Sequence, residues 1–321
     1  MRGKLVVAVA AAFGLMGSAV QAAPAGTALP VPGTSCTVFP ATNVWNMDVS
    51  ALPINTKSKM WKRSAAAGTT LLHPDFGPPA YGLPYDVVNG ATHSLTTVKF
   101  QYKSESDPGP YPFDGATHVE GGSDQHALMV DSRDCTLYEL YHARWNGGAP
   151  TAGSGAIFDL TSNVLRPPGW TSADAAGLPI FPGLVRWDEV QAGHIDHAIR
   201  FTVDCTTTAY IWPARHQAGV SDSHCPPMGA RFRLRSSFDI SGFSADAQVI
   251  LRAMQRYGMI VADNGTNWYF QGTVDPGWTN GLLDQLKTVP AKAFVAVDES
   301  GCQVGANSAA FAYGASCPAP A

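Results

Sequence analysis

The chain has 321 residues, of which 14% are charged, and its formal net charge is -4 at pH 7. This balance gives no electrostatic basis for binding nucleic acid or an anionic membrane, because both interactions depend on basic surface charge. We therefore expect neither of them among the partners. The low charge, with 32 glycines and 24 prolines, is typical of a rigid, loop-rich extracellular β protein.

The N-terminal sequence predicts a secretory signal peptide. Arg2 and Lys4 precede an apolar run that ends in small residues near Ala22, which is the arrangement that export signals use. The run is too short for a comfortable membrane span, and no later segment reaches the required length. We predict a secreted monomer that is organised as a signal peptide over 1–23, a disordered leader over 24–34 and a single β-rich domain over 35–321.

All six cysteines follow the predicted signal peptide, and no two of them form a CxxC pair. An even number of cysteines in an exported chain favours disulfides over metal ligands. The count permits many pairings, but closeness in sequence favours two local bridges and leaves the other two cysteines for each other. The expected pairs are Cys205–Cys225, Cys302–Cys317 and Cys36–Cys135.

Strand patterns dominate the middle of the chain. Alternating or β-forming residues predict strands over 96–102, 126–131, 136–143, 197–204, 209–214 and 230–238. The turn residues 131–135 would join the second and third of these segments into a hairpin. The expected fold class is mainly β, a sandwich or distorted barrel, with a few α-helices and support from disulfides.

The later part of the chain adds two helices. The segment 244–258 has an apolar stripe, with Ser244 as the N-cap and Gly258 at the end. Residues 259–273 predict a hairpin through an Asn-Gly turn. A second short helix over 278–289 then precedes a strand over 293–298.

The segment 118–126, "HVEGGSDQH", is the first candidate for catalysis. Gly121 and Gly122 allow a close bend that exposes Glu120 and Asp124 beside His126. Two carboxylates and a histidine are the groups needed for acid–base cleavage of a glycosidic bond. A polar turn that is capped by Asp124, with Glu120 in a salt bridge, explains the same residues without catalysis.

A metal site is a weaker hypothesis. His126, Glu139 and His142 are of the types that bind zinc, but their spacing forms no known ligand pattern. His194 and His197 would point to opposite faces of a strand, so they would not easily share one ion. We predict no metal or other cofactor, while zinc held by dispersed ligands stays an open alternative.

The proline- and glycine-rich segment 165–201 is long for an irregular stretch unless it packs tightly or forms a site. Asp174 in this segment is either a catalytic carboxylate or a residue of the first turn of a helix that starts at 171–174. We predict Asp174, Glu189 and His197 as further catalytic candidates, and as sugar contacts Trp170, Arg186, Trp212 and His216.

The segment 230–238 places Arg231, Arg233 and Arg235 on one strand face. A solvated face that pairs with acidic side chains is the usual outcome. Recognition of uronate carboxylates is the alternative, because arginine binds carboxylates through paired donors.

Several longer motifs resemble a family of exported microbial proteins. They are "ESDPGPYP" (105–112), "SADAAGLPIFPGLVRWDEV" (172–190), "PPMGARFRL" (226–234) and "YGMIVADNGTNWY" (257–269), within a resemblance that extends from about Asn43 to about Val297. The resemblance implies one continuous exported domain and carries no activity or residue role with it.

These observations favour a secreted glycoside hydrolase that cleaves an extracellular polysaccharide or oligosaccharide. The catalytic candidates are Glu120, Asp124, His126, Asp174, Glu189 and His197. A polysaccharide lyase acting on a uronate-containing glycan is the first alternative, with Tyr141 or a histidine as the base. A non-catalytic carbohydrate-binding or cell-surface protein is the second. The sequence lacks a GxSxG elbow, an HExxH motif and a Walker loop, which excludes several other enzyme classes.

Overall fold

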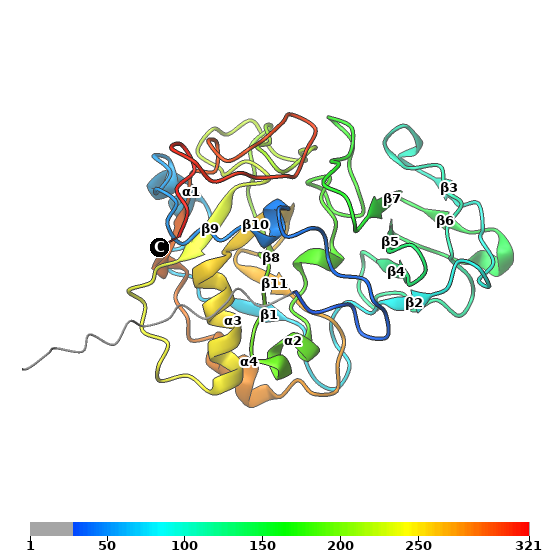
Figure 1. Ribbon diagram of the computed structural model, residues 1–321, viewed down its shortest axis with the longest axis horizontal. Coiled ribbons are helices and arrows are strands. Elements are labelled where there is room, and N and C mark those ends of the chain that lie inside the picture. The colour runs from blue at the N-terminus through cyan, green and yellow to red at the C-terminus, as the bar shows by residue number, and fades with distance from the viewer. Residues whose placement is uncertain (1–27, 321) are drawn as a thin grey trace, which may run out of the picture.

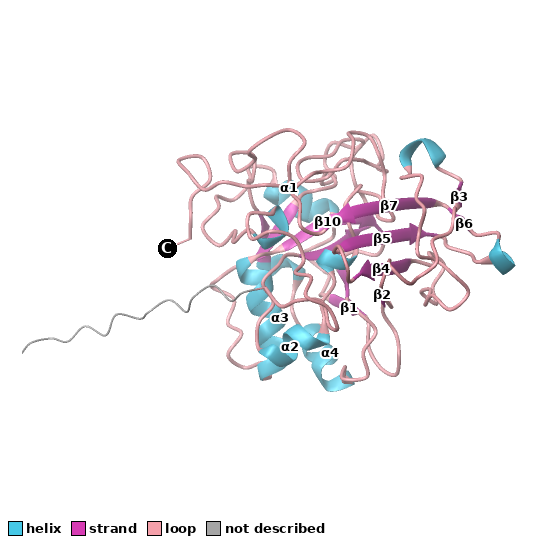
Figure 2. Ribbon diagram, turned by 45° about the vertical axis from the view of Figure 1, so that its right-hand side comes forward, coloured by secondary structure: helices cyan, strands magenta, loops and turns pink. Residues whose placement is uncertain are grey.

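The structure of the protein is a computed structural model that describes residues 28–320. The predicted signal peptide lies outside the described residues. Strands hold 25% of the described residues and helices hold 16%, so the predicted mainly β fold with a few helices is confirmed. Figure 1 shows the strands in two groups that lie side by side, and Figure 2 shows the long loops that surround them.

The first group is a six-stranded mixed sheet. Its order is β1 (His73–Asp75), β11 (Tyr269–Gln271), β8 (Ile199–Val203), β10 (Met259–Asn264), β9 (Arg231–Leu234) and β12 (Phe294–Ala296). The neighbouring strands β8 and β10 run parallel, whereas β11 and β9 run antiparallel to them. The carboxyl ends of β8 and β10 therefore meet the amino ends of β1 and β11 at one edge of the sheet.

The second group is a four-stranded sheet with a small sheet beside it. The four-stranded order is β2 (Asp86–Val88), β4 (Ala127–Asp131), β5 (Thr136–Tyr141) and β7 (Ser154–Asp159), and the small sheet pairs β3 (Lys99–Phe100) with β6 (Thr151–Ala152). The predicted hairpin of β4 and β5 is confirmed, with Ala127 opposite Leu140 and Asp131 opposite Thr136.

One apolar core joins the two sheets. Alternation along β4 directs Leu128 and Val130 into this core together with Phe201 and Phe232 of the six-stranded sheet. The other face of β4 carries Met129, which packs in a smaller cluster beneath the small sheet. The shared core holds the two sheets together and so fixes the polar groups that lie between them.

Four α-helices occur in the described chain, and most of them lie against the six-stranded sheet (Figure 1). They are α1 (Ser58–Ser64), α2 (Trp187–Ala192), α3 (Ala245–Arg256) and α4 (Asn280–Leu286). The predicted N-cap Ser244 is confirmed, because it accepts the Ala247 N–H. Thr279 caps α4 in the same way by accepting the Leu282 N–H. Single-turn 3₁₀ helices are η1 (Val44–Asn46), η2 (Lys103–Glu105), η3 (Asn146–Gly148), η4 (Phe181–Gly183) and η5 (Ala291–Ala293).

The predicted hairpin over 259–273 is wrong. Its two halves form β10 and β11, but β8 lies between them and pairs with both. All five residues of β8 are buried, so this apolar strand satisfies its backbone hydrogen bonds and buries its side chains best at the centre of the sheet. The Asn-Gly turn pattern is local, so it does not show that the distant strand β8 competes for the same pairing.

Other local predictions also differ from the structure. The expected strand 209–214 is a loop with isolated bridges, and only Lys99 and Phe100 of 96–102 form a strand. Residues 171–174 do not begin a helix. The expected disordered leader is wrong for its described part, because Val31 is fully buried and its N–H donates to the carbonyl of Cys36.

The three predicted disulfides, Cys36–Cys135, Cys205–Cys225 and Cys302–Cys317, are all present. The first attaches the N-terminal segment to the turn of the β4–β5 hairpin. Disulfides of this number are typical of extracellular proteins. No helix within residues 28–320 has the length and apolar character that crossing a bilayer requires.

We expect the loss of the Cys36–Cys135 bridge to lower the free energy of unfolding more than the loss of Cys302–Cys317. The bridged residues are 99 and 15 positions apart. The unfolded chain gains more conformational entropy when the longer loop is released, with losses of about 4.7 and about 3 kcal/mol. Urea unfolding of the two double alanine variants measures the difference, and an equal or larger loss for the shorter loop would contradict this account.

Candidate active site

A polar pocket of about 460 Å³ lies where the two sheets meet, at the carboxyl ends of β5 and β10. Its wall includes the segment 171–175, which runs between the sheets. Four acidic residues line it, namely Glu105, Asp124, Asp174 and Asp263, together with the tyrosines Tyr102 and Tyr141 and with His216. Within residues 28–320, no lysine or arginine lines the pocket.

A buried ion pair connects the pocket wall to the six-stranded sheet. Arg200 of β8 donates from Nε and Nη2 to the two carboxylate oxygens of Asp174, over 2.9 and 2.7 Å. Its Nη1 donates to Oε1 of Gln271 over 2.6 Å. Asp174 is fully buried and Arg200 is 4% exposed, so the paired geometry compensates for the desolvation of both charges. This contact fixes the wall segment 171–175 to the centre of the six-stranded sheet.

Asp263 of β10 lies beside this ion pair and is partly exposed to the pocket. Burial and then the negative charge of Asp174 raise the pKa of Asp263 to about 7, although Arg200 acts in the opposite direction. The side chain is therefore a neutral acid over much of the range below pH 7. A carboxylic acid with such a pKa, next to an ionised carboxylate, is suited to donate a proton.

A β-bulge explains why the sequence pattern did not identify Asp263. The pairing of β10 with β8 shifts after Val261, so that Asp263 lies opposite Thr202. Regular pairing would place Asp263 opposite Val203, on the sheet face that is opposite to Arg200. The extra residue in the bulge brings Asp263 to the face of Arg200 and thus to Asp174. The string "VADNGT" gives no signal for this shift apart from the polar residues themselves.

Two further carboxylates lie on the pocket wall. Oε2 of Glu105 accepts the Thr171 N–H over 3.3 Å and lies 3.6 Å from Nε2 of His216. His216, predicted as a substrate contact, is held by a hydrogen bond from Nδ1 to the carbonyl of Ala175 over 2.7 Å. Asp124, a predicted catalytic residue, is exposed. The structure therefore brings Asp124, Asp174 and His216 to one pocket.

His126 and Glu120 form an ion pair behind the wall of the pocket. Nδ1 of His126 lies 2.6 Å from Oε2 of Glu120, and its Nε2 lies 3.2 Å from the carbonyl of Ala173. Both ring nitrogens face acceptors, which favours the doubly protonated imidazolium. Neither side chain lines the pocket, so the pair supports the wall segment rather than facing a substrate.

His126 and Glu120 shift each other's pKa values. Burial disfavours the imidazolium, but the hydrogen bond and charge of Glu120 outweigh burial and raise the pKa of His126 above its usual 6.5. Burial also opposes ionisation of Glu120, but the hydrogen bond and charge of His126 outweigh it and lower the pKa of Glu120 below its usual 4.5.

Glu189 and His197, also predicted as catalytic, lie in a separate buried cluster. Oε1 of Glu189 is 3.1 Å from Nη2 of Arg186, and Oε2 is 3.2 Å from Nε2 of His197. None of these three residues lines the pocket. Each charge has a partner within the cluster, which is the arrangement that buried ions need for stability.

The predicted tryptophan contacts also lie outside the pocket. Trp170 stacks near the guanidinium of Arg166, with Cζ 5.6 Å from the ring centroid. Nε1 of Trp212 donates to the carbonyl of Ser308 over 2.8 Å. The aromatic residues of the pocket are instead Tyr102 and Tyr141.

The arginines on β9 have protein acceptors. Arg231 pairs with Glu299 over 2.6 Å between Nη1 and Oε1, and it also donates to backbone carbonyls. Arg233 donates to the carbonyls of Val49 and Ser50, and Arg235 donates to that of Lys292. These contacts favour a structural role over recognition of uronate carboxylates.

The considered metal ligands His126, Glu139 and His142 are not brought together as one site. Glu139 is fully buried and accepts the N–H groups of Ile180 and Phe181. Burial nevertheless raises the pKa of Glu139 to about 7, against the effect of these two hydrogen bonds.

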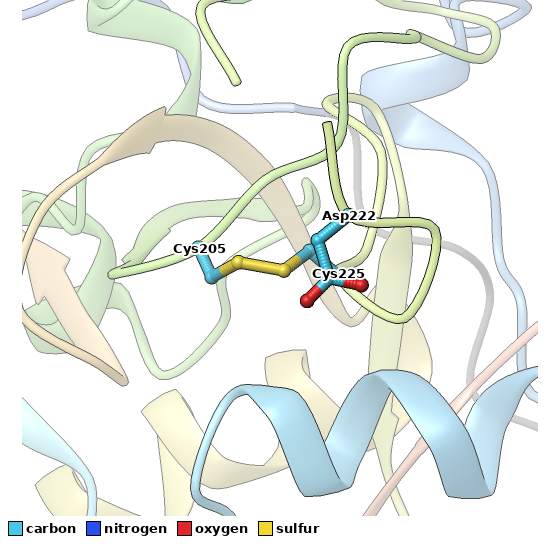
Figure 3. Close-up of side chains that lie close together, drawn as sticks. All are labelled: Cys205, Asp222 and Cys225. Atoms are coloured by element: carbon cyan, nitrogen blue, oxygen red, sulfur yellow. A yellow bond between two sulfur atoms is a disulfide. The ribbon is translucent and has the colours of Figure 1, made fainter. Parts of the chain in front are cut away.

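Figure 3 shows the grouping within residues 28–320 that has metal-ligand spacing, Cys205, Asp222 and Cys225. The two sulfurs are joined in a disulfide, so they offer no thiolate to an ion. Asp222 binds His224 through a hydrogen bond to Nδ1 over 2.8 Å. This grouping is therefore a disulfide-closed loop.

No protein-family model, curated protein or solved structure matches this chain. We therefore infer the function of the protein from the geometry and chemistry of the pocket.

We expect the stability gained from the His126–Glu120 pair to depend on pH. The raised pKa means that the His126 contribution is fully present below pH 6.5 and is lost as pH rises through the folded value. The lowered pKa means that the Glu120 contribution is present above pH 4.5 and is lost as pH falls through the folded value.

The measurement is urea unfolding of the wild type and His126→Asn at about pH 5.5 and about pH 8.5. We expect the difference in free energy of unfolding to be larger at the lower pH. His142→Asn, at a partly exposed histidine, is the control and should show a smaller pH dependence. A difference for His126→Asn that is constant with pH would contradict a charged pair.

Proposed function

We propose that the protein is a secreted glycoside hydrolase that cleaves an extracellular polysaccharide by carboxylate acid–base chemistry in the pocket between the two sheets. The observation that carries this proposal is Asp263, a carboxylic acid with a pKa of about 7 that faces an open polar pocket beside the ionised Asp174. The three disulfides support export, as does the N-terminal sequence.

In this mechanism Asp263 is the general acid. It donates its proton to the glycosidic oxygen while the bond from that oxygen to the anomeric carbon breaks. Asp174 maintains the raised pKa of Asp263 because its negative charge opposes ionisation nearby. Arg200 holds the carboxylate of Asp174 in place through two hydrogen bonds, so Asp174 and Arg200 are positioning residues.

A second carboxylate completes the reaction. Glu105 and Asp124 both line the pocket and offer carboxylate oxygens to a water molecule or to the anomeric carbon. Glu105 is the better ordered of the two, because the Thr171 N–H and His216 fix its Oε2. We assign Glu105 as the base or nucleophile and Asp124 as a contact to the sugar hydroxyls.

The rest of the pocket suits a sugar ring. Tyr102 and Tyr141 offer aromatic surface, and Ser154, Thr171 and Asn264 add polar groups on the wall. Aromatic surface beside hydrogen-bonding groups matches the apolar faces and polar edges of a sugar. The volume of about 460 Å³ lies in the usual range for small-ligand sites.

Hydrolysis fits this pocket better than the two alternatives. A uronate lyase needs cations to neutralise the substrate carboxylate, but no lysine or arginine within 28–320 lines the pocket. Burial raises the pKa of Tyr141, which reduces the fraction of the phenolate that would act as the base. A simple binding protein would not need several titratable groups that converge on one cavity.

The purified mature chain should release reducing ends from at least one polysaccharide of a panel of xylan, laminarin, mixed-linkage β-glucan, glycol chitosan and polygalacturonate. Reducing ends and ultraviolet absorbance of unsaturated products are measured together. New reducing ends without new absorbance support hydrolysis. Absorbance from polygalacturonate would instead establish a lyase, and the absence of both products on all substrates would refute an enzyme of this class.

We expect Asp263→Asn to lower kcat by about 10²- to 10⁴-fold, the usual contribution of a general acid. Wild-type kcat should fall as pH rises through about 7, because Asp263 then loses its proton. Asp284→Asn, at an exposed position of α4, is the matched control and should retain full activity. If the kcat of Asp263→Asn equalled that of the wild type, Asp263 would not be the general acid.

The stability of Asp263→Asn provides a check on folding. The pKa of Asp263 is about 3.8 in the unfolded chain and about 7 in the folded protein. The free energy of unfolding therefore falls as pH rises from 3.8 to about 7. The asparagine carries no charge, so the variant should be at least as stable as the wild type above pH 7. A loss of activity with retained stability then reports on chemistry.

A further inference from the structure

A second pocket lies on the same edge of the six-stranded sheet as the candidate active site. Its volume is about 800 Å³. It is lined by the amino ends of β1 and β11 at His73 and Tyr269, by Asp204 just after β8, and by the turn 265–267 just after β10. Because Asn264 lines the first pocket and Gly265 lines the second, one turn separates the two pockets.

A stacked aromatic pair, His73 and Tyr269, lies on one side of the second pocket. His73 and Tyr269 are directly opposite each other in the pairing of β1 with β11. Their rings are stacked, with centroids 3.9 Å apart and an interplanar angle of 16°. Desolvation lowers the pKa of His73, which favours the uncharged imidazole. Leu71, which is 49% exposed, adds apolar surface beside it.

Hydrogen-bonding groups surround this aromatic surface. Asn267 is only 9% exposed, and its Oδ1 accepts the Asp204 N–H over 3.0 Å. Its amide nitrogen has no hydrogen-bond partner among residues 28–320. The carboxylate of Asp204, which is exposed, and the ammonium of Lys287 also face this pocket. Donors and acceptors next to an aromatic face are the combination that binds sugar rings.

The distance between the two pockets can be spanned by a polymer but not by a single small ligand. The strands between them follow the order β1, β11, β8 and β10. Neighbouring strands are about 4.8 Å apart, so the three steps from β1 to β10 span about 14 Å. A single small ligand in the first pocket would not contact the aromatic pair, whereas an extended chain lying along the sheet edge would.

We propose that the second pocket is a binding subsite for a remote part of the same glycan chain that the first pocket cleaves. The inference rests on the proposed function for its choice of ligand, a polysaccharide. The subsite holds a sugar ring on the His73–Tyr269 stack, with Asn267 and Asp204 as hydrogen-bonding partners. It therefore selects polymers over short oligosaccharides.

The test compares the wild type with Tyr269→Leu and Asp204→Asn on two substrates, the polysaccharide that the panel identifies and a disaccharide of the same linkage. We expect KM for the polymer to rise about tenfold in Tyr269→Leu, with little change for the disaccharide. Tyr313→Leu, at a partly exposed tyrosine outside both pockets, is the matched control. Equal effects on both substrates, or no effect on either, would overturn the inference.

Affinity electrophoresis through gels that contain the same five panel polysaccharides tests binding without catalysis. We expect at least one polysaccharide to retard the wild type, with less retardation of Tyr269→Leu and unchanged retardation of Tyr313→Leu. No retardation of the wild type in any gel would refute the subsite. Retardation that depends on Tyr269 in a chain that cleaves nothing would support the subsite and refute the proposed hydrolysis.

Discussion

The ion pair between Arg200 and Asp174 is the interaction on which the candidate site depends. Arg200 lies on β8, the strand that both β10 and β11 pair with, and its guanidinium group also binds Gln271 of β11. Asp174 lies on the irregular segment that passes between the two sheets. The pair therefore connects the centre of one sheet to the pocket wall, and its loss would leave an unpaired charge in the interior.

The same ion pair explains the electrostatics of the pocket. Its charges neutralise each other at short range, yet the carboxylate of Asp174 is close enough to Asp263 to oppose a second ionisation. His126 and Glu120 support the wall from behind through the carbonyl of Ala173. The buried charges thus form a support for the wall, and the proposed chemistry is confined to the few side chains that face the cavity.

Sheet geometry connects the proposed catalytic pocket with the proposed glycan subsite. The ends of β8 and β10 and the beginnings of β1 and β11 share one edge of the sheet. Side chains at strand ends lie at the surface, outside the packed core. Polar and aromatic residues are therefore tolerated at such an edge, and binding residues often occur there. An extended polymer is the ligand whose shape matches a row of such positions.

The sequence by itself determined the features that depend on local patterns: the mainly β character, the β4–β5 hairpin, the helices α3 and α4 and the three disulfide pairs. Alternation, caps and short cysteine spacings act over a few residues, and the last pair followed from the first two. It also supplied Asp124, Asp174 and His216 as site candidates, because polar residues in irregular segments are visible in the sequence. Only the tertiary structure decided that β8 separates β10 from β11, that Glu189 and His197 belong to another cluster, and that a bulge directs Asp263 towards Asp174. These features result from competition among distant segments for burial and hydrogen bonds, which no local pattern records.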